Sequence, residues 1–170
     1  GNCCRTKHLK DSHVMDVNRI LCPVDFSEPS FKALDIADEM ARHFGAELVV
    51  LHVLVPNAEI NTDWTDASNM SLGLAQQEQI EGQQEVLIEE LGKRLGEDRD
   101  PGAIILWGEP AEEIVNLAVE RDVDLIVIAT HGRTGFRHLV FGSVAEQVVR
   151  LADCPTLVVP ARERGTTDAE

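Results

Sequence analysis

Apolar residues along this chain alternate between short runs and helical stripes. Five short runs predict strands, at residues 20–24, 47–55, 103–107, 125–128 and 156–159. Between most of them, apolar positions recur with the 3.6-residue spacing of an amphipathic helix. This regular alternation predicts an α/β fold, with a parallel sheet covered by helices on both faces.

Two long helices are expected in the first half of the chain. The first begins after Ser27, whose side chain can accept a hydrogen bond from the first turn, and ends at Gly45. The second covers residues 76–95 and follows a polar loop at residues 56–74. Its buried stripe is predicted from the spacing of its apolar residues, namely Ile80, Leu87, Ile88, Leu91 and Leu95.

Two shorter helices are expected in the second half. Pro110 suits the first turn of the third helix, because a backbone N–H has no helical partner at that position. The fourth helix runs from Ser143 to about Leu151. Ser143 and Glu146 have the spacing of a capping box, which predicts that the serine side chain caps this helix.

The length of 170 residues favours a single domain with a core of useful size. We expect this domain to span residues 15–162, because Met15 looks like a natural start and a strand pattern follows it closely. Residues 1–14 match no periodic pattern and are interpreted as a cloning remnant or a disordered extension, and residues 163–170 as a flexible tail.

The formal net charge of −15 limits the choice of partners. Such an average field repels duplex nucleic acid and anionic membranes, so neither is expected as a partner. The four cysteines form no C-x-x-C pair, and Cys22 and Cys154 are interpreted as small buried residues in a reducing cytosol. No apolar run approaches the ~20 residues of a membrane span, so we expect a cytoplasmic protein.

Residues 129–135, with the sequence Ala-Thr-His-Gly-Arg-Thr-Gly, form the most informative segment of the chain. They directly follow a predicted strand and lead to a helix start at Gly142 and Ser143. A glycine-punctuated loop between a strand end and a helix N-terminus suits a phosphate, because backbone N–H groups and the helix dipole both favour an anion there. The alternative is that the glycines serve only as flexible turn formers.

Each candidate side chain also has a plain structural explanation. Asp25, at the end of the first strand, can accept hydrogen bonds from ribose hydroxyls or can form a turn ahead of the first helix. Ser143 can donate its hydroxyl and N–H to a phosphate or can cap its helix. His131 can contact a phosphate, act as an acid–base group or serve as an ordinary loop residue. His52 lies in an apolar strand and is better explained as a core histidine than as a ligand.

Basic residues near the glycine-punctuated segment are few. Arg133, Arg137 and His138 either neutralise phosphate charge or are solvated loop residues. The first strand–helix turn contains no glycine, so the G-x-G-x-x-G dinucleotide fingerprint is absent. There is also no G-x-x-x-x-G-K-[ST] loop, which argues against a P-loop NTPase.

Taken together, these segments resemble the universal stress protein family, specifically its ATP-binding branch. The family signature is Gly, two residues, Gly, nine residues, then Gly followed by Ser or Thr, and here Ala129, Gly132, Gly142 and Ser143 take those positions. Residues 20–27, 50–53 and 129–135 resemble the first strand and turn, the second strand and the loop of the family. The likeness covers about Arg19 to Pro160.

The resemblance implies a Rossmann-like, doubly wound five-stranded parallel sheet in the order 3-2-1-4-5. It also implies a homodimer through the last strand, residues 156–159, or a higher oligomer. The dimer has support from the residues as well, because a short apolar strand at a sheet edge invites pairing with another chain. The implied ligand is ATP, or the related ADP or AMP, with Mg²⁺ or Mn²⁺ carried by the phosphates rather than by protein side chains.

The resemblance further implies particular nucleotide contacts. Pro23, Val24 and Asp25 would contact adenine and ribose, and Leu48 would offer backbone atoms to the adenine. The residues that would border the ribose and phosphates are Ala129, Thr130, His131, Gly132, Arg133, Thr134 and Gly135. The residues that would hold phosphates at the helix start are Gly142, Ser143, Val144 and Ala145.

One residue departs from the family signature. Ala129 replaces its first glycine, which is harmless at negative φ and obstructive at positive φ or at a close backbone approach. The leading hypothesis is an ATP-binding stress protein that changes state or partner with nucleotide. The alternatives are a nucleotide-independent dimeric scaffold of the same fold and a slow ATP hydrolase, for which only His131 or Asp25 are candidates to position water.

Overall fold

The computed structural model describes residues 16–55, 66–96, 99, 101–130 and 142–161. Of residues 66–73 and 75, only the backbone is described. The expected extension at residues 1–14 and tail at residues 163–170 lie outside this part of the chain. The elements follow in the order β1 (Arg19–Pro23), α1 (Glu28–Phe44), β2 (Glu47–Leu54), α2 (Asp66–Leu95), β3 (Gly102–Trp107), α3 (Pro110–Glu120), β4 (Leu125–Ala129), α4 (Ser143–Leu151) and β5 (Thr156–Val159).

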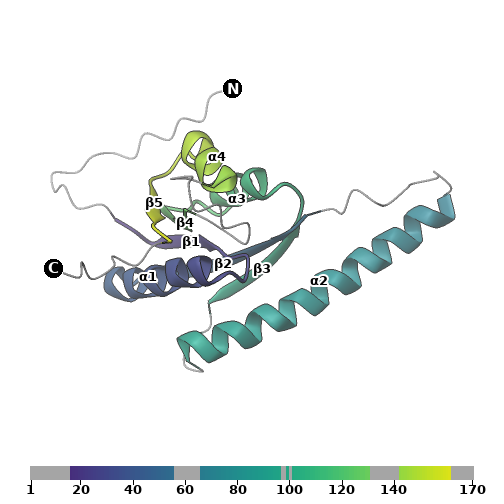
Figure 1. Ribbon diagram of the computed structural model, residues 1–170, viewed down its shortest axis with the longest axis horizontal. Helices are drawn as coiled ribbons and strands as arrows, with labels where there is room; N and C mark the ends of the chain where they lie inside the picture. Colours follow the sequence, from purple (N-terminus) through teal and green to yellow (C-terminus); the bar gives the residue numbers. More distant parts are fainter. Residues whose placement is uncertain (1–15, 56–65, 97–98, 100, 131–141, 162–170) are drawn as a thin grey trace, which may run out of the picture.

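The strands form one parallel sheet in the order β3-β2-β1-β4-β5, which confirms the expected topology. Helices α1 and α2 lie on one face of this sheet, and α3 and α4 lie on the other (Figure 1). Alternate residues of each strand feed two cores: Ile20 and Val50 face α1 and α2, whereas Leu21 and Val49 face α3 and α4. Burial on both faces explains why the strands are apolar at nearly every position.

Helix boundaries confirm several of the sequence signals. The Ser27 side chain accepts a hydrogen bond from the backbone N–H of Ser30 at the start of α1, and Gly45 ends that helix with a left-handed φ of 66°. Pro110 occupies the first turn of α3. These local signals are reliable because each one satisfies a backbone requirement of a helix terminus.

Helix α2 differs from the prediction in its start and its buried stripe. It begins at Asp66 rather than Gln76, so residues 66–74, expected in a loop, are helical. Extending an existing helix needs no new nucleus, and a polar segment can therefore continue it. Leu87 and Leu91 are buried as predicted, but Ile88 is 54% exposed because it points about 100° away from Leu87 around the helix axis. The first half of α2 extends beyond the edge of the sheet (Figure 1).

The amino-terminal rim of the sheet is held by polar contacts. Asp124, just before β4, accepts hydrogen bonds at Oδ2 from the backbone N–H groups of Asn18 at 2.9 Å and Arg19 at 3.1 Å. The Arg19 guanidinium donates to Glu47 at 2.8 Å and also to the carbonyl oxygen of Arg121. These contacts join the starts of β1, β2 and β4.

In the described part of the chain, no helix has both the length and the apolar character needed to span a bilayer.

Candidate functional site

The carboxyl ends of β1 and β4 bring the predicted site elements to one rim of the sheet. Ile20 lies opposite Leu125 in the parallel pairing of these strands, and continuing that register places Asp25 level with Thr130. The backbone N–H of Gly142 donates to the carbonyl oxygen of Thr130 at 2.5 Å. Asp25, the end of β4 and the start of α4 therefore lie at this rim.

Asp25 forms a tight turn ahead of α1. Its Oδ1 accepts hydrogen bonds from the backbone N–H of Ser27 at 3.1 Å and from the Ser27 hydroxyl at 2.5 Å. Its own backbone N–H donates to Oγ of Ser30 at 3.3 Å. The turn-forming explanation is therefore correct. It is compatible with ligand binding, because an ionised carboxylate offers about four acceptor sites.

Helix α4 starts without a side-chain cap, and this overturns the predicted capping box. The N-cap residue is Gly142, with φ −75° and ψ 155°, and Ser143 is already the first helical residue. A glycine at the N-cap has no side chain that could accept a hydrogen bond from the first turn. Oε1 of Glu146 lies 3.8 Å from Nη1 of Arg150, which is one turn further along the helix. The first turn thus presents backbone N–H groups and a positive dipole end, an arrangement that favours an anion.

Ala129 sits at its position without backbone strain. It ends β4, where it lies opposite Val159, and its side chain packs in the core on the α1 face. Among the described residues other than glycine, positive φ occurs only at Phe26 and Asp122. The methyl group that replaces the signature glycine therefore occupies an ordinary strand position.

Thr130 has a structural role at the same rim. Its backbone N–H donates to the carbonyl oxygen of Val159 at 2.9 Å, and its Oγ1 accepts from the backbone N–H of Ala161 at 3.1 Å. These bonds fix the end of β5 to the end of β4. Thr130 thus shapes the rim by holding two strands together.

Pro23 and Val24 lie at the end of β1, next to Asp25. Val24 is buried, and its backbone N–H donates to the carbonyl oxygen of Leu51 at 2.8 Å, which extends the pairing of β1 with β2. Pro23 is half-buried opposite Leu51. Both residues border the rim.

Leu48 lies away from this rim. It is the second residue of β2 and pairs with Ile20, near the start of β1. At about 3.3 Å per strand residue, it is roughly 16 Å from Val53, and Val53 is the residue that the β1–β2 register places level with Asp25. The sequence analysis missed Val53, although the rule that ligands bind at the carboxyl ends of parallel strands points to it.

The remaining predicted contacts lie outside the described residues. They are His131, Gly132, Arg133, Thr134 and Gly135, together with the nearby Arg137 and His138. Among the described residues, no group of three or more histidine, cysteine, aspartate or glutamate side chains is placed to hold a metal ion.

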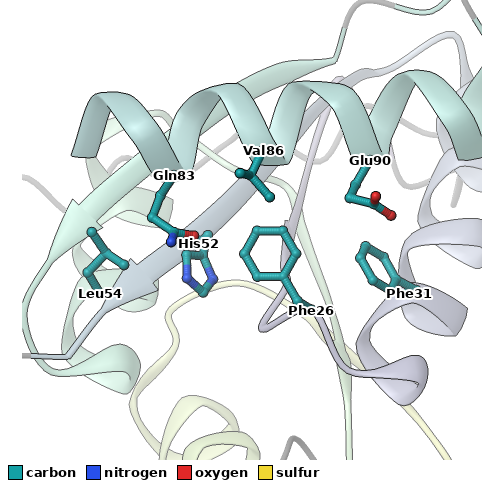
Figure 2. Close-up of a pocket in the computed structure, with 7 residues that line it drawn as sticks. All are labelled: Phe26, Phe31, His52, Leu54, Gln83, Val86 and Glu90. Carbon is teal, nitrogen blue, oxygen red and sulfur yellow. The ribbon is translucent and has the colours of Figure 1, made fainter. Parts of the chain in front are cut away.

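A groove of about 450 Å³ lies behind the Asp25 turn, on the α2 side of the sheet. Figure 2 shows three side chains of α2 over this groove, with Gln83 above His52, Val86 above Phe26 and Glu90 above Phe31. None of its lining residues is a lysine or arginine, so it is unsuited to a phosphate. The complete lining is Phe26, Phe31, His52, Leu54, Gln83, Val86 and Glu90.

His52 belongs to the packed core beside that groove. It is 7% exposed, and its Nδ1 lies 2.7 Å from the carbonyl oxygen of Val24. A carbonyl oxygen only accepts, so this ring nitrogen carries the proton. The expectation of a satisfied core histidine is confirmed.

Comparison with known proteins places the chain in a family. Residues 17–160 match the model of the universal stress protein family, and the chain belongs to that family. It is 34% identical over 145 residues to universal stress protein YxiE of Bacillus subtilis, with 84% of this chain and 98% of that protein covered.

Solved structures show the same fold. The structure of the Methanocaldococcus jannaschii protein MJ0577 superimposes with a TM-score of 0.67 at 30% identity, over 88% of this chain and 99% of that one. A universal stress protein solved in complex with cAMP superimposes with a TM-score of 0.61 at 21% identity, over 86% of this chain and 99% of the other, and this likeness concerns the fold.

Proposed function

We propose that this protein binds an adenine nucleotide, with ATP as the main ligand, and acts as a nucleotide-dependent sensor or regulator in a stress response. One observation carries the proposal: a helix start with a glycine N-cap and no side-chain cap stands at the same rim as the Asp25 carboxylate. An anion suits the helix start, and a hydroxyl-bearing sugar suits the carboxylate. A nucleotide has both groups.

The described residues have distinct roles in this proposal. The Ser143 hydroxyl and the backbone N–H groups of residues 143–145 donate to phosphate oxygens. Asp25 accepts from the ribose hydroxyls, while Pro23, Val24 and Val53 border the base. Leu48 is not included among the proposed contacts, because it lies near the start of β2, at the opposite rim of the sheet. Residues 129–135 and Gly142 border the ribose and phosphates, and Mg²⁺ or Mn²⁺ is carried by the phosphate oxygens, which are the ligands these ions prefer.

A homodimer through β5 is part of the proposal. This strand is at one edge of the sheet, and Leu157 in it is 37% exposed. Val149 and Leu151 of α4 are also exposed, which gives the neighbouring surface an apolar character. An unpaired edge beside apolar side chains favours pairing with a second copy. Light scattering of the wild type and of Leu157→Lys tests this, with a dimer expected only for the wild type.

Calorimetry with ATP and Mg²⁺ tests the nucleotide proposal directly. We expect binding to the wild type and complete loss in Ser143→Asp, because a carboxylate at the helix start competes with the phosphates for the same N–H groups. Ser143→Asn is the matched control, since it has nearly the same size without the charge. Absence of heat with the wild type would contradict nucleotide binding and favour a nucleotide-independent scaffold.

The ribose contact has its own test. Asp25→Asn keeps an oxygen that can accept from Ser27 but removes the negative charge, and we expect ATP affinity to fall about tenfold, the value of one hydrogen bond to a charged group. Asp16→Asn is the control, because this exposed aspartate precedes β1 at the opposite rim of the sheet. Equal affinities in the two variants would remove Asp25 from the site.

A further inference from the structure

The backbone of Phe26 has a conformation that side chains rarely adopt. Its φ is 62°, in the left-handed region, where Cβ crowds the following carbonyl oxygen. Phe26 stands between Asp25 and Ser27, the two residues that form the turn at the rim. Such strain persists only where the surroundings enforce it, and it often occurs at functional sites.

Aromatic contacts hold the Phe26 side chain in place. Its ring meets the imidazole of His52 edge to face, with centroids 4.7 Å apart and an interplanar angle of 66°. The centroid of the Phe26 ring lies 6.2 Å from that of the Phe31 ring, with an interplanar angle of 75°. Figure 2 shows the Phe26 ring between His52 and Phe31, beneath Val86 of α2. These distances and angles are those of favourable aromatic pairs.

His52 also fixes the residue on the other side of Asp25. Its Nδ1–H donates to the carbonyl oxygen of Val24 at 2.7 Å, while the Val24 N–H donates to Leu51. Both polar backbone groups of Val24 are therefore held by β2. One buried imidazole thus contacts the residue before Asp25 through a hydrogen bond and the residue after it through its ring.

We propose that Phe26 and His52 are positioning residues, which hold the Asp25 carboxylate in the orientation that the ribose hydroxyls require. This inference rests on the proposed nucleotide function. Asp25 is half-buried in a short turn, and both of its neighbours in the chain, Val24 and Phe26, are in contact with His52. Holding the acceptor in place before binding removes an ordering cost from the binding step. The effect is specific to ligands that carry the hydroxyls.

The test compares ATP with 2′,3′-dideoxy-ATP, both with Mg²⁺, by calorimetry on each protein. The wild type is expected to prefer ATP by at least about tenfold, the value of one hydrogen bond to a charged group. Phe26→Gly keeps the left-handed conformation accessible but removes the ring, so most of that preference should disappear while binding of the dideoxy ligand is unchanged. Phe26→Leu preserves an apolar side chain in the core and is expected to show the same loss.

His52 offers a rescue experiment. In His52→Asn, the side-chain amide can donate to Val24 in place of Nδ1, so we expect most of the preference for ATP to be kept. His52→Leu has a similar volume and no donor, and it should lose the preference. When His52→Leu is combined with Asp25→Asn, the losses of preference for ATP should be far from additive, because both changes act on the same contact.

The outcomes separate this inference from the function on which it rests. A wild type that binds neither ligand overturns both. A wild type that prefers ATP, with Phe26→Gly, Phe26→Leu and His52→Leu all keeping that preference, overturns the positioning role and leaves nucleotide binding intact. Additive losses with Asp25→Asn likewise overturn the positioning role, because residues that act through the same carboxylate do not contribute independently. A general weakening of the fold would be recognised separately, since it would lower the affinity for both ligands equally.

Discussion

The backbone N–H of Gly142 and the carbonyl oxygen of Thr130 form a hydrogen bond of 2.5 Å, which joins the residue after β4 to the N-cap of α4. The same threonine holds the end of β5 through its N–H and its hydroxyl. Thr130 is therefore a junction of two strands and a helix. Its place in the chain suggests a ligand contact, whereas its side-chain bond to Ala161 is internal to the fold.

Thr130→Val separates these two roles. The change preserves the shape of the side chain and removes the acceptor for the Ala161 N–H, so the free energy of unfolding should fall by about 1 kcal/mol. ATP affinity should stay within about twofold, because Thr130 is proposed to border the nucleotide through its backbone, which the change preserves. Denaturant titration and calorimetry measure the two quantities. A large loss of affinity at unchanged stability would place the hydroxyl in the ligand site.

Adjacent apolar residues on α2 offer a matched pair. Leu87 is fully buried and Ile88 is 54% exposed. We expect Leu87→Ala to lower the free energy of unfolding by about 2–5 kcal/mol and Ile88→Ala to change it by less than about 0.5 kcal/mol. Urea denaturation of both variants checks this. Equal losses would show that α2 is rotated relative to the arrangement described above.

Two glycines with open surroundings should respond to alanine in opposite ways. Among the described residues, and apart from the adjoining backbone, no heavy atom lies within 4 Å of a Cβ added at Gly45 or Gly92. Gly45 has a φ of 66°, so Gly45→Ala should destabilise the protein by about 1 kcal/mol. Gly92 is inside α2, and Gly92→Ala should stabilise it by about 0.5–1 kcal/mol. Thermal melts of the pair are the measurement, and melting temperatures that shift in the same direction would contradict the assigned backbone conformations.

Cys22 predicts a loss of stability at alkaline pH. Burial raises the pKa of its thiol far above the ordinary value, with a smaller contribution from the Asp35 carboxylate. The unfolded chain loses this proton above about pH 8.5, while the folded protein keeps it. The stabilising contribution is therefore complete below that pH and is lost as the pH rises toward the raised folded pKa. The expected loss from this thiol approaches about 1.4 kcal/mol per pH unit.

The Cys22→Ala variant is the control for this prediction. It is less stable at neutral pH because a buried group is shortened, but its stability should fall less steeply between about pH 9 and 11. Subtracting the two curves of unfolding free energy against pH removes the contributions of the lysines and the other cysteines, which both proteins share. Tyrosine titration does not contribute, because the chain contains no tyrosine. Parallel curves over this range would show that the Cys22 thiolate is tolerated in the folded state.

Much of the fold could be predicted from local signals. Ser27 and Gly45 mark the ends of α1 because each satisfies a backbone requirement that is visible in the residue type. Apolar runs predicted the positions of the strands, because strands with helices on both faces of their sheet are apolar at nearly every position. The shared rim of Asp25 and Thr130 agrees with the strand order that the resemblance implied, because neighbouring parallel strands end on the same side.

The errors arose where the sequence has no internal marker. Ser143 and Glu146 match a capping box, but the pattern does not reveal that Gly142 is the residue outside the helix. Leu87 and Ile88 differ in burial only through the rotation of α2 against the sheet. Leu48, in an apolar strand, carries no sign of which end it occupies, and only the pairing with Ile20 shows this.

The polar ties among Asn18, Arg19, Glu47 and Asp124 lie at the rim opposite Asp25 and α4. They align the starts of the strands, and none of these four residues is among the proposed ligand contacts. The residues that stabilise the sheet are therefore separate from those proposed to bind the ligand, so the binding residues can change without loss of the fold. Laboratory evolution confined to the Asp25 and α4 end should yield folded proteins with new ligand preferences, whereas the same number of changes around Asp124 should yield mainly unfolded chains.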